Sequence, residues 1–101
     1  MRLTPEQITV IKQAAVKFFG PDTSVRLFGS RADDTQRGGD IDLYIQTRTE
    51  NVLDIVRSEI AFLAEIKMKL GDQKIDVLID YPSRKTHNPI YEIARETGIT
   101  L

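Results

Sequence analysis

The sequence predicts an α/β (α+β) fold, a small mixed sheet of three or more strands with helices packed on one face. Short segments of strand composition occur at residues 25–28, 40–45 and 74–79, and in the last two apolar residues alternate with polar ones. Longer segments repeat apolar residues at helical spacing, at residues 5–19, 51–70 and 89–95. Because the apolar side of the strands must be covered, we expect the helices on that side and the other side open.

Capping residues mark the ends of the predicted helices. Thr4-Pro5-Glu6-Gln7 is a capping box with proline at the first helical position, and Gly20-Pro21 ends the first helix. Gly71 ends the helix over residues 51–70, whose length suits a crossover between the second and third strands. The last helix begins at Asn88-Pro89, where asparagine is a favoured cap.

The spacing of apolar residues predicts which side chains of each helix are buried. The first helix is expected to bury Ile8, Ile11, Ala15, Phe18 and Phe19. The long helix is expected to bury Val52, Ile55, Val56, Ile60, Leu63, Ile66 and Leu70. The last helix is expected to pack down through Ile90 and Ile93, with Ile99 after it.

Length and composition fit one domain over residues 1–101, with no room for a second lobe. The 14 basic and 15 acidic residues leave a net charge of −1, so we expect no direct binding of nucleic acid. There is no cysteine, which excludes disulfides and thiol catalysis. The first residues form neither a signal peptide nor a membrane span, so we expect no membrane partner and a cytoplasmic location.

A glycine-serine turn follows the first predicted strand. Ser30 and Asp33 have the spacing of a capping box, and the free N–H groups at a helix start can bind an anion such as phosphate. Gly29 would let a ligand approach the backbone closely. The alternative is that Ser30 only caps a surface turn.

Carboxylates occupy alternate positions of the second strand. Asp40 and Asp42 would lie on one face with Cα atoms roughly 6.5–7 Å apart. Their side chains could then converge on a pair of divalent ions spaced about 3.5–4 Å. The alternative is a half-exposed strand whose wet face carries two acids. If both strands belong to one sheet with aligned apolar faces, Asp76 of the third strand shares that face.

Together these residues resemble a known signature. Gly29-Ser30, nine further residues, Asp40-Ile41-Asp42 and a later Asp76 are similar to the pattern of the DNA-polymerase-beta-like nucleotidyltransferase superfamily. The short chain, its F-G-S-R opening and its I-D-V-L-I strand resemble the minimal nucleotidyltransferase (MNT) family. In prokaryotes MNT proteins often partner HEPN-domain toxins as antitoxins. The resemblance covers roughly residues 5–101.

The resemblance implies a function and a role for each site residue. Asp40 and Asp42 would hold two Mg²⁺ ions, and Asp76 would complete the second metal site and take the proton of the acceptor. Gly29 and Ser30 would position the phosphates of the nucleotide. AMP would then move from ATP to a hydroxyl side chain of a HEPN-type toxin and silence it.

Charged loop residues leave several interpretations open. Arg31 and Arg37 could each bind a triphosphate, since guanidinium matches phosphate geometry, or could be solvated loop charges. Asp33-Asp34 would compete with a bound triphosphate. The basic loop over residues 81–87 is an ordinary solvated loop, a contact for a partner, or a contact for the nucleotide.

Two other functions compete with protein modification. The first is an antitoxin that neutralises its partner by binding alone, with no catalysis. The second is a transferase that acts on a small molecule or RNA, which the missing second lobe and the acidic net charge disfavour. The sequence is compatible with homo- and hetero-oligomers alike.

Overall fold

The chain forms a four-stranded mixed sheet in the order β3-β2-β1-β4. The computed structural model describes residues 3–32, 39–71, 73–82, 84 and 88–101. The strands are β1 (Ser24–Phe28), β2 (Ile41–Gln46), β3 (Ile75–Asp80) and β4 (Ile99–Thr100). β2 pairs with β1 antiparallel and with β3 parallel, and β4 adds an antiparallel edge beside β1. The predicted fold class, a small α+β fold with a mixed sheet, is confirmed.

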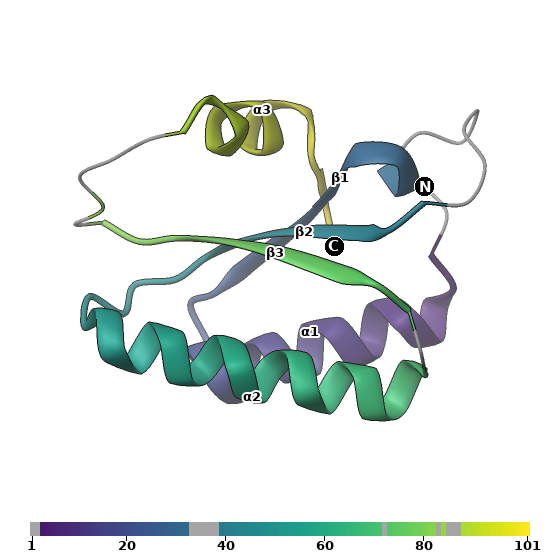
Figure 1. Cartoon of the computed structure of the whole chain (residues 1–101), viewed down its shortest axis with the longest axis horizontal. Coiled ribbons are helices and arrows are strands. Elements are labelled where there is room, and N and C mark those ends of the chain that lie inside the picture. The colour runs from purple at the N-terminus through teal and green to yellow at the C-terminus, as the bar shows by residue number, and fades with distance from the viewer. Residues whose placement is uncertain (1–2, 33–38, 72, 83, 85–87) are drawn as a thin grey trace.

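Three α-helices and one short 3₁₀ helix accompany the sheet. Their bounds are α1 (Pro5–Phe19), η1 (Gly29–Ala32), α2 (Val52–Leu70) and α3 (Pro89–Thr97). α1 and α2 lie side by side against one face, whereas α3 crosses the other face (Figure 1). In the described part of the chain no helix has the length and apolar character needed to span a membrane.

The helix ends follow the predicted caps. Both halves of the capping box are formed at α1, since the Thr4 hydroxyl accepts from the Gln7 N–H and the Gln7 side chain accepts from the Thr4 N–H. At α2 the Asn51 side chain accepts from the backbone of Leu53 and Asp54. Asn88 caps α3 in the same way. These local bonds supply partners for N–H groups that a helix start leaves without one.

The main core lies between the sheet and the α1–α2 pair. Ile41, Leu43 and Ile45 of β2 are fully buried there, as the alternation predicted. The rings of Phe19 and Phe62 meet edge to face, with centroids 5.7 Å apart, where α1 crosses α2. Fully burying side chains of this size stabilises the fold by about 1.5–3 kcal/mol each.

The buried face of α2 is rotated from the predicted one. Ile55 and Ile66 are buried as expected, but Phe62, which the predicted stripe omitted, is fully buried as well. Val52, Val56 and Ile60 are exposed, and their predicted burial is wrong. The reason is that α1 packs along one flank of α2, where Phe62 joins the core, so the apolar residues on the outer side are left exposed to solvent.

α3 also packs differently from the prediction, because it partly covers the face expected to be open. Its contact is made by the fully buried Ala94 against Phe28 and Tyr44. The expected contacts are wrong: Ile90, Ile93 and Ile99 are 42%, 56% and 37% exposed. α3 is held there because β4, just after it, pairs with the edge of β1.

The end of α3 is fixed tightly to β1. The guanidinium of Arg26 donates to the carbonyl of Arg95 in the last turn, where a positive charge suits the helix dipole. A Cβ atom on Gly98 would lie 2.9 Å from the Cβ of Arg26 and 2.5 Å from the carbonyl oxygen of Ala94. Only glycine therefore allows the chain to turn from α3 into β4 so close to the sheet.

Tyr44 anchors the interior under α3. Its ring is 1% exposed and meets Tyr91 edge to face, and its hydroxyl donates to Asp80 Oδ2 at 2.6 Å. Burial, followed by the hydrogen bond and the charge of Asp80, raises the pKa of Tyr44 to about 12. The phenol therefore stays protonated and remains the donor at any physiological pH.

We expect Tyr44→Phe to lower the free energy of unfolding by about 1–2 kcal/mol, since a partly buried carboxylate oxygen of Asp80 loses its donor. Urea denaturation followed by circular dichroism measures this change. Asp80→Asn and the double variant complete a thermodynamic cycle, in which the two changes should be clearly non-additive. Additive losses would show that the hydrogen bond is not the source of the effect.

Candidate functional site

The registers of the sheet bring the predicted acids together on the face away from α1 and α2. Asp42 of β2 lies opposite Asp76 of β3 in the parallel pair, and opposite Phe28 in the antiparallel pair. Asp40 comes just before β2, where the Ile41 N–H donates to the carbonyl of Lys74 at 3.0 Å. The predicted arrangement of Asp42 and Asp76 on one sheet face is therefore present, whereas Asp40, predicted to lie in the strand, precedes it.

The charges of the neighbouring acids act on Asp42. The pKa of Asp42 is raised, first by burial and then by the charges of Asp76 and Asp40, and also by a hydrogen bond with Asp76. Lys74 opposes this increase, and its Nζ lies 3.4 Å from Asp40 Oδ2 in an exposed ion pair. Asp42 thus holds a negative charge that its surroundings only partly compensate.

Gly29 closes the site on the side of the turn. It has φ +74°, and a Cβ atom there would lie 2.3 Å from Asp42 Oδ2. The backbone at the start of η1 consequently contacts the carboxylate directly, which no other residue type would allow. The glycine-serine turn and the second-strand acids, which are separated in sequence, form one structural unit.

Arg31 makes contacts that the sequence did not suggest. Its Nε donates to the carbonyl of Gly39 at 3.3 Å, and its Nη2 donates to Gln73 Oε1 at 3.5 Å. The side chain therefore connects η1 with the segments that lead into β2 and β3. This structural role is compatible with either interpretation of its charge, phosphate binding or a loop position.

Several predicted features lie outside the described residues. They are Arg37, Asp33-Asp34, the capping box between Ser30 and Asp33, and most of the basic loop that contains His87. The backbone of Ser30 lies in η1, which begins at Gly29. This helix therefore begins earlier than the one that the spacing of Ser30 and Asp33 predicted. The roles of Ser30 and Arg37 in binding a nucleotide stay predictions.

The acids are of a chemical type that binds divalent cations, but in the described ranges their side chains are not arranged as a metal-binding cluster. Carboxylate oxygens are the ligands that Mg²⁺ prefers, and a cation would relieve the repulsion that raises the pKa of Asp42. Among the residues with described positions, however, no three acidic, histidine or cysteine side chains are placed to hold one ion. The assignment of metal ligands therefore rests on the donor set and its position in the sheet.

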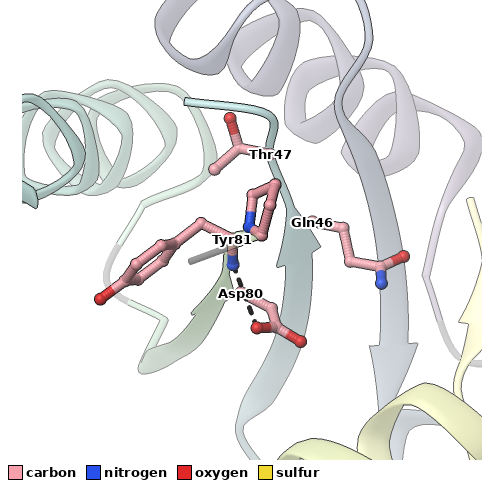
Figure 2. A pocket seen from close by; sticks show the side chains of 5 residues that line it. Gln46, Thr47, Asp80 and Tyr81 are labelled. Atoms are coloured by element: carbon pink, nitrogen blue, oxygen red, sulfur yellow. Dashed lines mark hydrogen bonds between the residues drawn. The ribbon is translucent and has the colours of Figure 1, made fainter. Parts of the chain in front are cut away.

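A second polar centre, missed from the sequence, occupies the other end of β2 and β3. A cavity of about 240 Å³ is lined by Gln46, Thr47, Asp80, Tyr81 and Pro82 (Figure 2). Asp80 Oδ1 accepts from the Tyr81 N–H at 3.0 Å, and the dashed line in Figure 2 marks this bond. The sequence signal that could have found Asp80 is the alternation of the third strand, which continues from Asp76 through Leu78 to Asp80.

Arg84 belongs to this second centre. Its guanidinium lies over the rings of Tyr81 and Tyr91, 5.0 and 4.2 Å from their centroids, and its Nε is 3.6 Å from Asp80 Oδ1. Arg84 is thus half-buried in internal contacts, and for this residue the solvated-loop alternative is wrong. Because Asp80 is already satisfied by protein groups, the centre has a structural explanation and is distinct from the site at Asp42.

We expect Asp42→Asn to increase the free energy of unfolding at neutral pH, although it changes a central residue of the site. A carboxyl whose pKa is raised in the fold costs stability when ionised. The gain should therefore be largest above the raised pKa of Asp42. It should shrink as pH falls through that pKa, and vanish below the ordinary value of 3.8.

Urea unfolding of both proteins over a pH series checks this prediction. Glu96→Gln, at an exposed position of α3, is the control for loss of one negative charge and should change stability little. An unchanged or reduced stability of Asp42→Asn at neutral pH would contradict the electrostatic description of the site.

Comparison with known proteins agrees with this geometry. A search of the curated proteins found no match for the chain. A family model described as nucleotidyltransferase domain matches residues 9–97, a stretch that contains Gly29, Asp40, Asp42 and Asp76. The match covers most of the 101 residues, and the α+β fold with a mixed sheet is consistent with it. The chain therefore belongs to the nucleotidyltransferase domain family.

Proposed function

We propose that this chain is a minimal nucleotidyltransferase domain that moves AMP from ATP to a hydroxyl side chain of a partner protein. Membership of the family supports nucleotidyl transfer as the reaction class. The observation that carries the proposal is the register of β2 and β3, which sets Asp42 opposite Asp76 beside the Gly29 turn. An acidic centre next to a turn whose backbone N–H groups could bind phosphate supports the proposal.

The proposed roles follow from the position of each group. Asp40, Asp42 and Asp76 would hold two Mg²⁺ ions, which when bound neutralise phosphate charge and lower the pKa of the acceptor hydroxyl. Gly29 and Ser30 would orient the triphosphate through backbone N–H groups, and the guanidinium groups of Arg31 and Arg37 would bind its phosphates.

In the transfer step the acceptor oxygen forms a bond to the α-phosphorus. The bond from that phosphorus to the bridging oxygen breaks, and pyrophosphate leaves with the electron pair. Asp76, which is exposed at the start of β3, would take the proton of the hydroxyl directly or through water.

A protein acceptor fits the surroundings of the acids. Asp76 is exposed and the side chain of Asp40 is 41% exposed, so a side chain of another protein can approach them. By its resemblance to MNT proteins, we propose that the acceptor lies on a HEPN-type toxin and that the chain is its cytoplasmic antitoxin. Modification of the hydroxyl would then silence the toxin.

A second candidate is an antitoxin that acts by binding alone. It is favoured by one observation: within the described ranges, the acids do not form a ready metal-binding cluster. In that case the acidic face would serve as an interface, and nucleotide transfer would not be required for neutralisation.

The two candidates differ in what happens to the partner. We expect the protein encoded by the neighbouring gene to gain AMP after incubation with this chain, ATP and Mg²⁺, as measured by intact-mass spectrometry. Replacing Asp40 and Asp42 together by Ala should slow the transfer by about a hundredfold or more. Glu6→Gln, in the exposed first turn of α1, should leave it unchanged. Complex formation with no added mass under any nucleotide would instead favour binding alone.

Gly29→Ala tests the contact between the turn and Asp42. The added Cβ should displace the carboxylate and strongly reduce the transfer rate, beyond the backbone strain of about 1–2 kcal/mol that a positive φ imposes. Gly71→Ala is a matched control, since Gly71 has φ +85° but nothing within 4 Å of the added atom. Equal transfer rates in the two variants would show that the close approach to Asp42 is unimportant.

A further inference from the structure

The outer side of α2 carries large apolar side chains in contact with solvent. Val52, Leu53, Val56, Ile60 and Met68 are 56%, 59%, 46%, 64% and 82% exposed. Most of them follow one another at three- and four-residue steps, so they form a stripe along one side of the helix. We call this set the α2 stripe. Large exposed apolar side chains that gather along one side of a helix mark a place where another molecule can pack.

The α2 stripe is separate from the acidic site. α2 lies on the face of the sheet opposite to α3 (Figure 1). Asp42 and Asp76 alternate with residues buried against α1 and α2, so their side chains lie on the α3 side. A molecule on the stripe would therefore leave Asp42 and Asp76 uncovered. The proposed transfer reaction does not account for this surface, and packing at the stripe requires no nucleotide transfer.

Charges beside the stripe favour a second copy of the chain as the occupant. The N-terminal end has Glu50 and Asp54, whereas the last turn has Lys67, next to Met68. Lys69, on the other side of the helix, lies 4.0 Å from Glu65 of its own chain. If two α2 helices pack antiparallel, the acidic end of each meets the basic end of the other. The two helix dipoles then point in opposite directions, which is also favourable. A parallel pair would bring like charges together.

We propose that two copies of this chain associate through antiparallel packing of their α2 stripes. Ile60 lies near the middle, and the two-fold axis of such a dimer would pass beside it. Lys67 and Leu53 are equally far from Ile60 along the helix, so Lys67 of one copy lies level with Leu53 of the other. Met68 is likewise level with Val52, and its flexible thioether suits an apolar contact.

Ile60→Glu tests the interface at its centre. Analytical ultracentrifugation across micromolar to millimolar concentrations should find a dimer for the unaltered chain. The variant should raise the dissociation constant by about thirtyfold or more. Ile93→Glu, at a position of α3 with a similar exposed fraction of 56%, is the matched control and should leave the dimer intact. Circular dichroism should report unchanged folding, since both side chains are exposed.

Charge exchange tests the antiparallel orientation. Asp54→Lys alone and Lys67→Asp alone should each weaken the dimer, and the double variant should restore it, because Lys67 of one copy, level with Leu53 of the other, lies one residue along the helix from the partner's Asp54. A monomer at every concentration, a dimer that survives Ile60→Glu, or a failure of the double variant to recover would overturn the proposal. So would a monomeric chain that uses the stripe to bind a different protein.

Discussion

The parallel pairing of β2 with β3 is the constraint on which the site depends. Ile41 pairs with Ile75 and Ile45 with Ile79, and all four side chains are buried against the helices. A slip of one residue would turn the apolar side chains of β3 to solvent and its acids into the core, so burial fixes the register strongly. The same register sets Asp76 opposite Asp42. Packing on one face thus determines the chemistry of the other.

This arrangement separates stability from function within one sheet. The α1–α2 side contributes the apolar burial, including the Phe19–Phe62 contact. The opposite side carries mutual repulsion, since the pKa of Asp42 is raised by burial and by neighbouring acids. α3 limits the open area by covering Phe28 and Tyr44 while leaving Asp76 exposed. A fold this small maintains unfavourable charge on one face because the other face stabilises it.

Local signals in the sequence were sufficient for most of the fold. Caps such as Thr4 and Asn88 are short-range devices, and they located the helix starts. The alternation of apolar and polar residues is also a short-range signal, and it placed Asp42 and Asp76 on the correct face of the sheet. The burial of Phe62 and the side of the sheet chosen by α3 could not be predicted, since both depend on contacts between distant segments.

The site was predictable to the same extent. The sequence placed the acids near the turn, but it did not reveal that Gly29 contacts Asp42 or that Arg31 reaches Gln73, which is far away in the chain. Asp80 was overlooked, although it continues the alternation of its strand, because its partners Tyr44 and Arg84 become neighbours only after folding. The functional roles of the acids stay predictions.

α2 and α3 lie on opposite faces of the sheet (Figure 1), and the acids share the face of α3, which has a consequence for valency. A pair of chains joined back to back would present two acidic sites that face away from each other. Such a pair could not enclose one small partner between its sites. It would gain avidity only with a partner that spans both outer faces, and otherwise would hold two partners at once, one on each side. The number of partners bound by each pair would then follow from the position of each acidic site, on the face of its sheet opposite to α2.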